Sequence, residues 1–135
     1  MRLKIEHPMK KKKLFSHAAT ILPVDDIMEA AAYYRDFLGF TIAFTWGNPV
    51  DYAVVSRDDA VAIHFSKRVG VGKLSADQVV LYIFVYDVDA VYQEYEQNGV
   101  PISMPIGDRL YGMRDFDIKD PNGYILSFGK SLELT

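Results

Sequence analysis

Apolar and polar positions along the chain follow the same order twice. Residues 17–24 form a mostly apolar run that predicts a strand, and residues 27–38 carry apolar side chains at helical spacing. Three segments that alternate or are rich in β-branched and aromatic residues then predict three strands, at 40–46, 51–57 and 60–66. The same order of strand, helix and three strands returns in residues 79–86, 87–98, 100–104, 112–119 and 124–130. The pattern therefore predicts a βαβββ unit that occurs twice.

Matching residues in the two units support this repeat. Val24 and Asp26 correspond to Val85 and Asp87, each 61 positions later. A fixed internal period indicates one supersecondary unit used twice, so a cleft between the copies should be nearly symmetric. We therefore expect an α+β fold, with two tandem modules forming a curved mixed sheet around a cleft and the helices on its outer face.

The ends of the first predicted helix are marked by capping residues. Asp26 can accept a hydrogen bond from free backbone amides, Glu29 completes a pair that resembles a capping box, and Gly39 provides the left-handed stop. A polar segment with two glycines separates the units and is interpreted as a linker. The predicted organisation is an N-terminal basic extension, a first module, a linker and a second module, at residues 1–16, 17–66, 67–77 and 78–131.

Composition narrows the classes of function. Half of the 135 residues are hydrophobic, and the net charge of −3 is spread along the chain, without the basic face that nucleic-acid binding requires. The basic run at residues 10–13 is interpreted as a solvated terminal arm. Cysteine is absent, which excludes disulfides and zinc–thiolate sites. No apolar stretch approaches the roughly 20 residues of a membrane span, and no signal-peptide pattern is seen, so a cytoplasmic protein is expected.

Five motifs, in this order and spacing, resemble a known superfamily over about residues 17–131. They are LPVDD at 22–26, YYRDFLGF at 33–40, FVYDVD at 84–89, YGMRDF at 111–116 and DPNG at 120–123. The chain resembles the vicinal-oxygen-chelate superfamily, which includes glyoxalase I, extradiol dioxygenases, fosfomycin-resistance enzymes and bleomycin-resistance proteins. The last two motifs are most similar to the bleomycin-resistance branch. Fold does not determine function here, because the superfamily contains both enzymes and pure binding proteins.

The resemblance implies four strand positions at which enzymes of the superfamily hold a divalent metal with His and Glu. In this chain they are occupied by Ala19, His64, Val80 and Ser127. A catalytic metal typically needs three protein ligands and an open position, so we expect neither a metal site nor another cofactor. A repositioned pair of His17 and His64 remains an alternative, because His17 lies two residues before Ala19.

Strand alternation assigns the side chains expected to face the cleft. Tyr82 and Phe84 lie on the same face of their strand as Val80, so they are expected to face the cleft. Ser127 is the position in the last strand that is expected to face the cleft. An apolar, aromatic-lined cavity is suited to a flat small molecule. Core packing is an alternative role for the aromatic residues. For Arg114 the alternative is an ion pair with Asp115 or Asp117. The predicted ligand-binding residues are Trp46, Tyr52, His64, Tyr82, Phe84, Tyr111, Met113, Arg114 and Ser127.

The resemblance implies a non-catalytic protein that binds an aromatic or glycopeptide small molecule. Its role would be to sequester an antibiotic or toxin. It also implies a homodimer, with the linker allowing exchange of modules. One alternative is a lyase or dioxygenase that depends on a divalent metal with atypical ligands. Another is a metal-free isomerase or lyase in which His64 is the base. The favoured role of His64 is to line the pocket, and a structural role is the next alternative.

Overall fold

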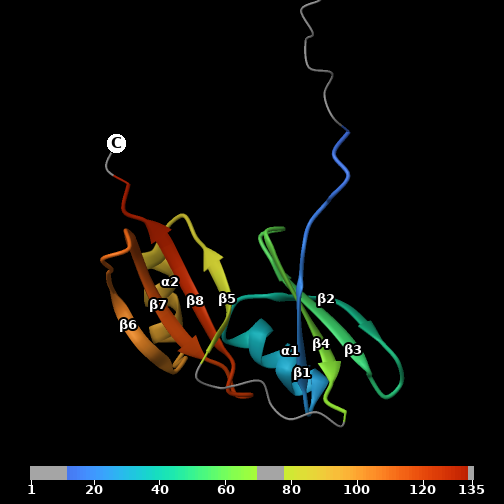
Figure 1. Cartoon of the computed structure of the whole chain (residues 1–135). Coiled ribbons are helices and arrows are strands. Elements are labelled where there is room, and N and C mark those ends of the chain that lie inside the picture. Colours follow the sequence, from blue (N-terminus) through green and yellow to red (C-terminus); the bar gives the residue numbers. More distant parts are fainter. Residues whose placement is uncertain (1–11, 70–77, 134–135) are drawn as a thin grey trace, which may run out of the picture.

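The repeated unit predicted from the sequence is present in the computed structural model, which describes residues 12–69 and 78–133 (Figure 1). The first module contains β1 Thr20–Val24, α1 Ile27–Asp36, β2 Thr41–Trp46, β3 Tyr52–Arg57 and β4 Val61–Lys67. The second contains β5 Val79–Phe84, α2 Val88–Gln97, β6 Ile102–Asp108, β7 Met113–Lys119 and β8 Ile125–Ser131. The α+β class and the two βαβββ modules are confirmed. Strand β1 begins later than predicted, and β6 extends four residues further.

Each module forms its own four-stranded mixed sheet. The strand orders are β1-β4-β3-β2 and β5-β8-β7-β6, in which β1 and β5 pair parallel and the other neighbours pair antiparallel. The helix of each module packs on one face of its own sheet and leaves the other face open. We call these the open face of the first sheet and the open face of the second sheet. The modules lie side by side in Figure 1, blue to green and yellow to red.

Local sequence explains how both helices begin. The side chains of Asp26 and Asp87 accept hydrogen bonds from the amides of Glu29 and Ala90, each at 3.0 Å. These bonds satisfy backbone donors that a helix start leaves without partners. After α1, Gly39 adopts a φ of 78°, a left-handed conformation that favours glycine. The predicted roles of Asp26 and Gly39 are therefore confirmed, and Asp87 has the same role as Asp26 in the second module.

The core joins the helix-facing sides of both sheets. The positions predicted to face inward from α1 and its C-terminal end are all buried: Ile27, Ala31, Tyr34 and Leu38. In the second module the rings of Phe116 and Phe128 stack with centroids 5.3 Å apart, and Tyr95 meets both of them edge to face. Such aromatic pairs stabilise a core beyond the area that they bury.

Two tyrosines at equivalent positions of the repeat connect the modules. The hydroxyl of Tyr34 in α1 donates to Asp120 Oδ2 at 2.8 Å, and that of Tyr95 in α2 donates to the carbonyl of Leu38 at 2.9 Å. Beside Tyr95, the guanidinium of Arg57 forms two hydrogen bonds with Glu94, at 2.8 and 2.9 Å. Each helix is thereby tied to the other module, which holds the two open faces in a fixed relation.

Tyr34→Phe is expected to lower the free energy of unfolding by about 1–3 kcal/mol. Asp120 is buried, and burial raises the pKa of its carboxyl although Tyr34 and the amides of Asn122 and Tyr124 donate to it. Removing the hydroxyl of Tyr34 leaves a buried acceptor short of one donor. Urea denaturation of the two proteins measures the difference.

The neighbouring tyrosine supplies the control for this experiment. Within the described residues, the hydroxyl of Tyr33 is buried without a hydrogen-bond partner. Tyr33→Phe removes the same atom but no hydrogen bond, so the free energy of unfolding should not fall. Equal effects of the two substitutions would contradict the role of the Tyr34–Asp120 bond.

Some predicted segments fall partly outside the described residues. Of the predicted N-terminal extension, residues 12–16 are described; they are exposed and lead away from the body of the protein (Figure 1). The predicted linker, 67–77, begins with Lys67, which is the last residue of β4, and residues 70–77 lie outside the described part. Neither α1 nor α2 is long and apolar enough to span a membrane, and the described residues contain no further α-helix.

Candidate ligand-binding site

The open face of the first sheet carries aromatic side chains and a histidine. Phe44 lies opposite Val54, which in turn lies opposite His64, so the three residues form one row across β2, β3 and β4. Trp46 and Tyr52 form the next pair along β2 and β3 on the same face. The Tyr52 hydroxyl and His64 Nδ1 are 2.6 Å apart, and the two rings meet edge to face. This contact sets the orientation of the imidazole in the wall of the open face.

The open face of the second sheet combines aromatic and acidic side chains. Tyr82 lies opposite Ser127, and Ser127 lies opposite Asp117, with which its hydroxyl forms a hydrogen bond. Phe84 belongs to the neighbouring row, which passes through Gly129 in β8 to Asp115 in β7. The rings of Tyr82 and Phe84 are 5.0 Å apart at their centroids. The aromatic side of this face therefore lies on β5, the edge strand nearer the first module.

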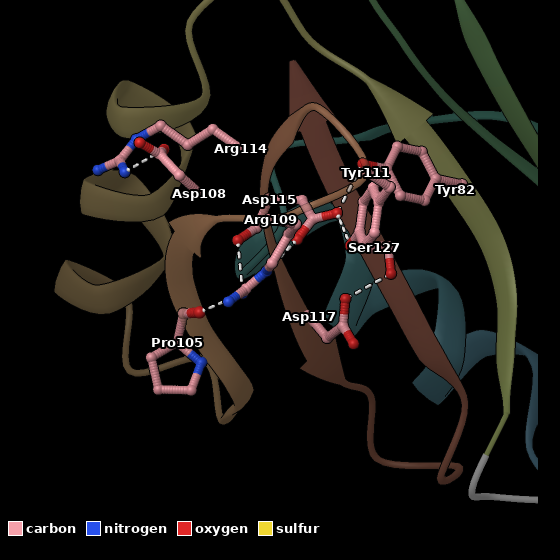
Figure 2. Close-up of polar contacts among 9 residues, drawn as sticks. All are labelled: Tyr82, Pro105, Asp108, Arg109, Tyr111, Arg114, Asp115, Asp117 and Ser127. Carbon is pink, nitrogen blue, oxygen red and sulfur yellow. Dashed lines mark hydrogen bonds and ion pairs between the residues drawn. The ribbon is translucent and has the colours of Figure 1, made fainter. Parts of the chain in front are cut away.

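Asp115 is the centre of a hydrogen-bond network on this second open face (Figure 2). Its side chain is 2% exposed, and Oδ2 accepts from the hydroxyls of Tyr82 at 2.8 Å and Tyr111 at 2.6 Å. Its other oxygen, Oδ1, accepts from Arg109 Nε at 2.8 Å. Arg109 Nη2 also donates to the carbonyls of Pro105 and Asp115, at 2.7 and 3.0 Å. The network joins β5, β7 and the turn between β6 and β7.

These contacts determine how the groups ionise. Burial opposes ionisation of Asp115, but the hydrogen bonds from Tyr111, Arg109 and Tyr82 outweigh burial and lower its pKa. The pKa values of Tyr82 and Tyr111 are raised, the first mainly by burial and the second mainly by the hydrogen bond to Asp115. At neutral pH the network thus contains a carboxylate, a guanidinium and two neutral phenols.

Arg114 lies on the opposite side of the second sheet. Its guanidinium donates to Asp89 of α2 at 2.8 and 3.2 Å and to Asp108 at 3.0 Å. The prediction that Asp115 or Asp117 would be its ion-pair partner is wrong, because neighbouring residues of a strand point to opposite faces. Figure 2 shows Arg114 turned towards α2. Met113, which alternation places on the open face, is half-buried and lies opposite Ser131.

A groove of about 500 Å³ lies between the two modules. Its walls are Ala18–Thr20 and Ala60–Ala62 from the first module and Val80–Phe84 from the second. Tyr82 and Phe84 belong to this lining, whereas Tyr52, His64 and Ser127 lie on the adjoining open faces. The groove and the two open faces together form the candidate site.

A family comparison fits this arrangement. Residues 14–128 match the model of the Glyoxalase/Bleomycin resistance protein/Dioxygenase superfamily. The chain belongs to this superfamily. A search of curated proteins gave no match.

Solved structures with the superfamily fold resemble most of the chain. TnmS3, an antibiotic-binding protein from Streptomyces sp. CB03234, has a TM-score of 0.72 at 20% identity, covering 89% of this chain and 99% of that one. TioX from Micromonospora sp. ML1 has a TM-score of 0.71 at 18% identity, covering 87% and 100%. A bleomycin-binding protein complexed with bleomycin has a TM-score of 0.70 at 20% identity, covering 87% and 99%. Identities this low establish the fold alone.

The metal positions implied by the superfamily do not fit a metal in this chain. Ala19 and Val80 line the groove, where their side chains offer no donor atom, and the Ser127 hydroxyl is bonded to Asp117. His17 is exposed and its ring contacts Ser16. Across residues 12–69 and 78–133, no three His, Asp or Glu side chains converge as metal ligands would. The donor set therefore falls short of the three ligands that a catalytic metal typically requires.

Stability in acid should depend on Asp115. Its pKa in the folded protein is lower than the value of about 3.9 in an unfolded chain, so its contribution is complete above that value. The contribution is lost as the pH falls through the folded pKa, when the carboxylate takes up a proton. The free energy of unfolding of the wild-type protein should therefore fall more steeply than that of Asp115→Asn in urea titrations between about pH 6 and pH 2.5. Parallel curves would contradict this assignment.

Sequence reasoning missed several residues of the site. Asp115 and Asp117 were considered only as partners of Arg114, although their alternation with Phe116 and Ile118 places both carboxylates on the open face. Arg109 had no recognisable signal, because it reaches Asp115 from a turn. Phe44 was also missed, although it lies two residues before Trp46 in β2 and therefore on the same face.

Proposed function

We propose that this superfamily member binds a flat, aromatic small molecule between its open sheet faces without converting it, and thereby sequesters an antibiotic or toxin. The observation that carries the proposal is the exposure of aromatic rings at the candidate site. Phe44, Trp46, Phe84 and Tyr111 are 53%, 62%, 75% and 67% exposed. Each open face carries two of these rings, and exposed apolar surface of this kind commonly marks a binding site. The antibiotic-binding and bleomycin-binding structural neighbours add support.

The polar groups at the site favour binding over catalysis. The side chains of Tyr52 and His64 are bonded to each other, and those of Asp115, Tyr82 and Tyr111 are bonded within one network. Ligand pockets combine apolar walls with a few polar groups that fix orientation, and these faces have that composition. The predicted ligand-binding residues apart from Arg114 remain in this proposal, and Phe44 is added to them.

A homodimer is part of the proposal. Leu14 and Phe15 are strongly exposed in the segment that leads away from the body, and both sheets have an uncovered face. A second copy that covers Leu14 and Phe15 would remove this apolar surface from water while leaving the open faces accessible to the ligand. Native mass spectrometry should give a dimer mass, whereas a monomer at micromolar concentration would contradict this part of the proposal. The expected location, the cytoplasm, remains a prediction.

Calorimetric titration with metal-free bleomycin, followed by a panel of other aromatic antibiotics, tests the function. We expect saturable binding, a change in fluorescence of Trp46, which is the only tryptophan, and recovery of unaltered ligand. Absence of binding across the panel would overturn the proposal. Turnover of a ligand that stops in His64→Ala, with binding retained, would support a metal-free enzyme instead, and one tightly bound metal per subunit would support the metal-dependent alternative.

A further inference from the structure

We propose that Asp115 is a positioning residue of the ligand-binding site, which holds Tyr82 and Tyr111 so that the site presents their rings to the ligand while their hydroxyls stay bound within the protein. This inference rests on the function proposed above. It assigns the recognition of an aromatic group to the second open face, and it assigns Asp115 a role that needs no contact with the ligand.

The geometry of the network carries this inference. Two phenols from separate elements, β5 and the turn before β7, donate to the same atom, Asp115 Oδ2, at 2.8 and 2.6 Å. Arg109 occupies Oδ1 and anchors the same turn through the carbonyl of Pro105. Asp115 itself is buried, and both of its carboxylate oxygens accept hydrogen bonds from the protein. Figure 2 shows Tyr82 and Tyr111 adjacent, with their hydroxyls directed towards Asp115.

Gly129 makes this arrangement possible. Strand β8 lies between β5 and β7, so Tyr82 must pass over β8 to reach Asp115. A Cβ atom at Gly129 would lie 2.0 Å from the Tyr82 hydroxyl and 3.0 Å from Asp115 Cβ. The 2.0 Å contact is excluded sterically, so a side chain at this position would displace the Tyr82 hydroxyl. The absence of a side chain at Gly129 in β8 and the carboxylate of Asp115 in β7 therefore both hold the Tyr82 hydroxyl in place.

The chemistry of the network indicates what the site recognises. The guanidinium of Arg109 balances the charge of Asp115, and both hydroxyl protons are directed to a carboxylate. Hydrogen bonds to a charged acceptor are roughly twice as strong as neutral ones, so a ligand would not easily draw the phenols away. What the two tyrosines offer is ring surface already held in place. A flat aromatic group that stacks or packs edge to face fits such a surface.

Tyrosine NMR tests the positioning role without any ligand. In the full-length protein labelled with ¹³Cζ-tyrosine, Tyr82→Phe and Tyr111→Phe assign the two signals. We expect Asp115→Asn to shift both signals and to let both phenols ionise nearer the ordinary value of about 10. Gly129→Ala should shift the Tyr82 signal far more than that of Tyr111. Asp36→Asn, the same substitution at an exposed position of α1 away from both open faces, should leave the assigned signals close to those of the wild type.

Binding of metal-free bleomycin, measured by calorimetry, tests the consequence for the site. Asp115→Asn and Gly129→Ala should each weaken binding roughly tenfold, because the loosened tyrosines must be ordered when the ligand binds. Asp36→Asn should bind within about threefold of the wild type, because Asp36 lies on α1 outside the candidate site. Unchanged affinity in both Asp115→Asn and Gly129→Ala would overturn the inference. It would show that the ligand binds loosened tyrosines as tightly as tyrosines held by Asp115.

The two proposals can fail separately. If the wild-type protein binds none of the aromatic compounds, the proposed function is overturned, and the tyrosine signals still decide whether Asp115 positions the two rings. If Asp115→Asn leaves both signals unchanged in a folded protein, the positioning role is overturned whatever the affinity. Gly129→Ala leaves the carboxylate in place, so it tests the Tyr82 contact even if Asp115→Asn does not fold.

Discussion

Phe116→Ala is expected to lower the free energy of unfolding by about 3–5 kcal/mol, the largest loss of stability among the changes considered. Phe116 is completely buried and stacks on Phe128, with Tyr92 and Tyr95 meeting it edge to face. Alanine would remove the ring and leave a cavity that two sheet strands and a helix cannot close. Urea denaturation, with the slope compared between the two proteins, gives the difference.

Phe44→Ala is the matched control for this change. It removes the same ring from the open face of the first sheet, where Phe44 is half exposed. Surface substitutions usually change the free energy of unfolding by less than about 0.5 kcal/mol. A large loss for Phe44→Ala would show that the open face is covered within the native protein. A small loss for Phe116→Ala would contradict the described core.

Trp46→Ala is expected to weaken the binding of metal-free bleomycin by at least about 30-fold, the effect of removing a tryptophan that anchors an interface. Trp46 lies on the open face of the first sheet, opposite Tyr52, with most of its ring exposed. A flat ligand can therefore stack on the indole without disturbing the core. Calorimetry measures the affinity directly, since the substitution removes the fluorescent group.

Two further variants separate stacking from a general loss of structure. Trp46→Phe keeps an aromatic ring and should recover most of the lost affinity. Met28→Ala removes a partly exposed apolar side chain from α1, away from both open faces, and should bind like the wild type. Equal affinity for Trp46→Ala and the wild type would place the ligand elsewhere and contradict the proposed site.

The elements of the fold were predictable because they depend on neighbouring residues. Alternation predicted the strands, helical spacing predicted the buried side of α1, and Asp26 and Asp87 marked both helix starts. The errors were at the ends of strands, where local signals are weakest. Lys67, assigned to a linker, is held in β4 by pairing with Val24 of β1, a partner 43 positions away in the chain.

The candidate site was predictable only in part. Alternation correctly put Tyr82, Phe84 and Ser127 on one face of the second sheet, because side-chain direction follows from position along a strand. Arg114 was assigned to the same region by its place in a motif, yet it points to α2. The network around Asp115 could not be predicted, because its donors come from β5 and from a turn.

The sequence by itself determined the repeated βαβββ plan, the superfamily and the residue types at the four positions where the superfamily's enzymes hold a metal. These follow from local periodicity, from motifs, and from which residue types stand at given positions. The tertiary structure alone decided that each module has its own sheet, that Tyr34 and Tyr95 tie each helix to the other module, and that Asp115 collects two phenols and a guanidinium. Such contacts join residues far apart in the chain, and their partners depend on the packing of whole elements.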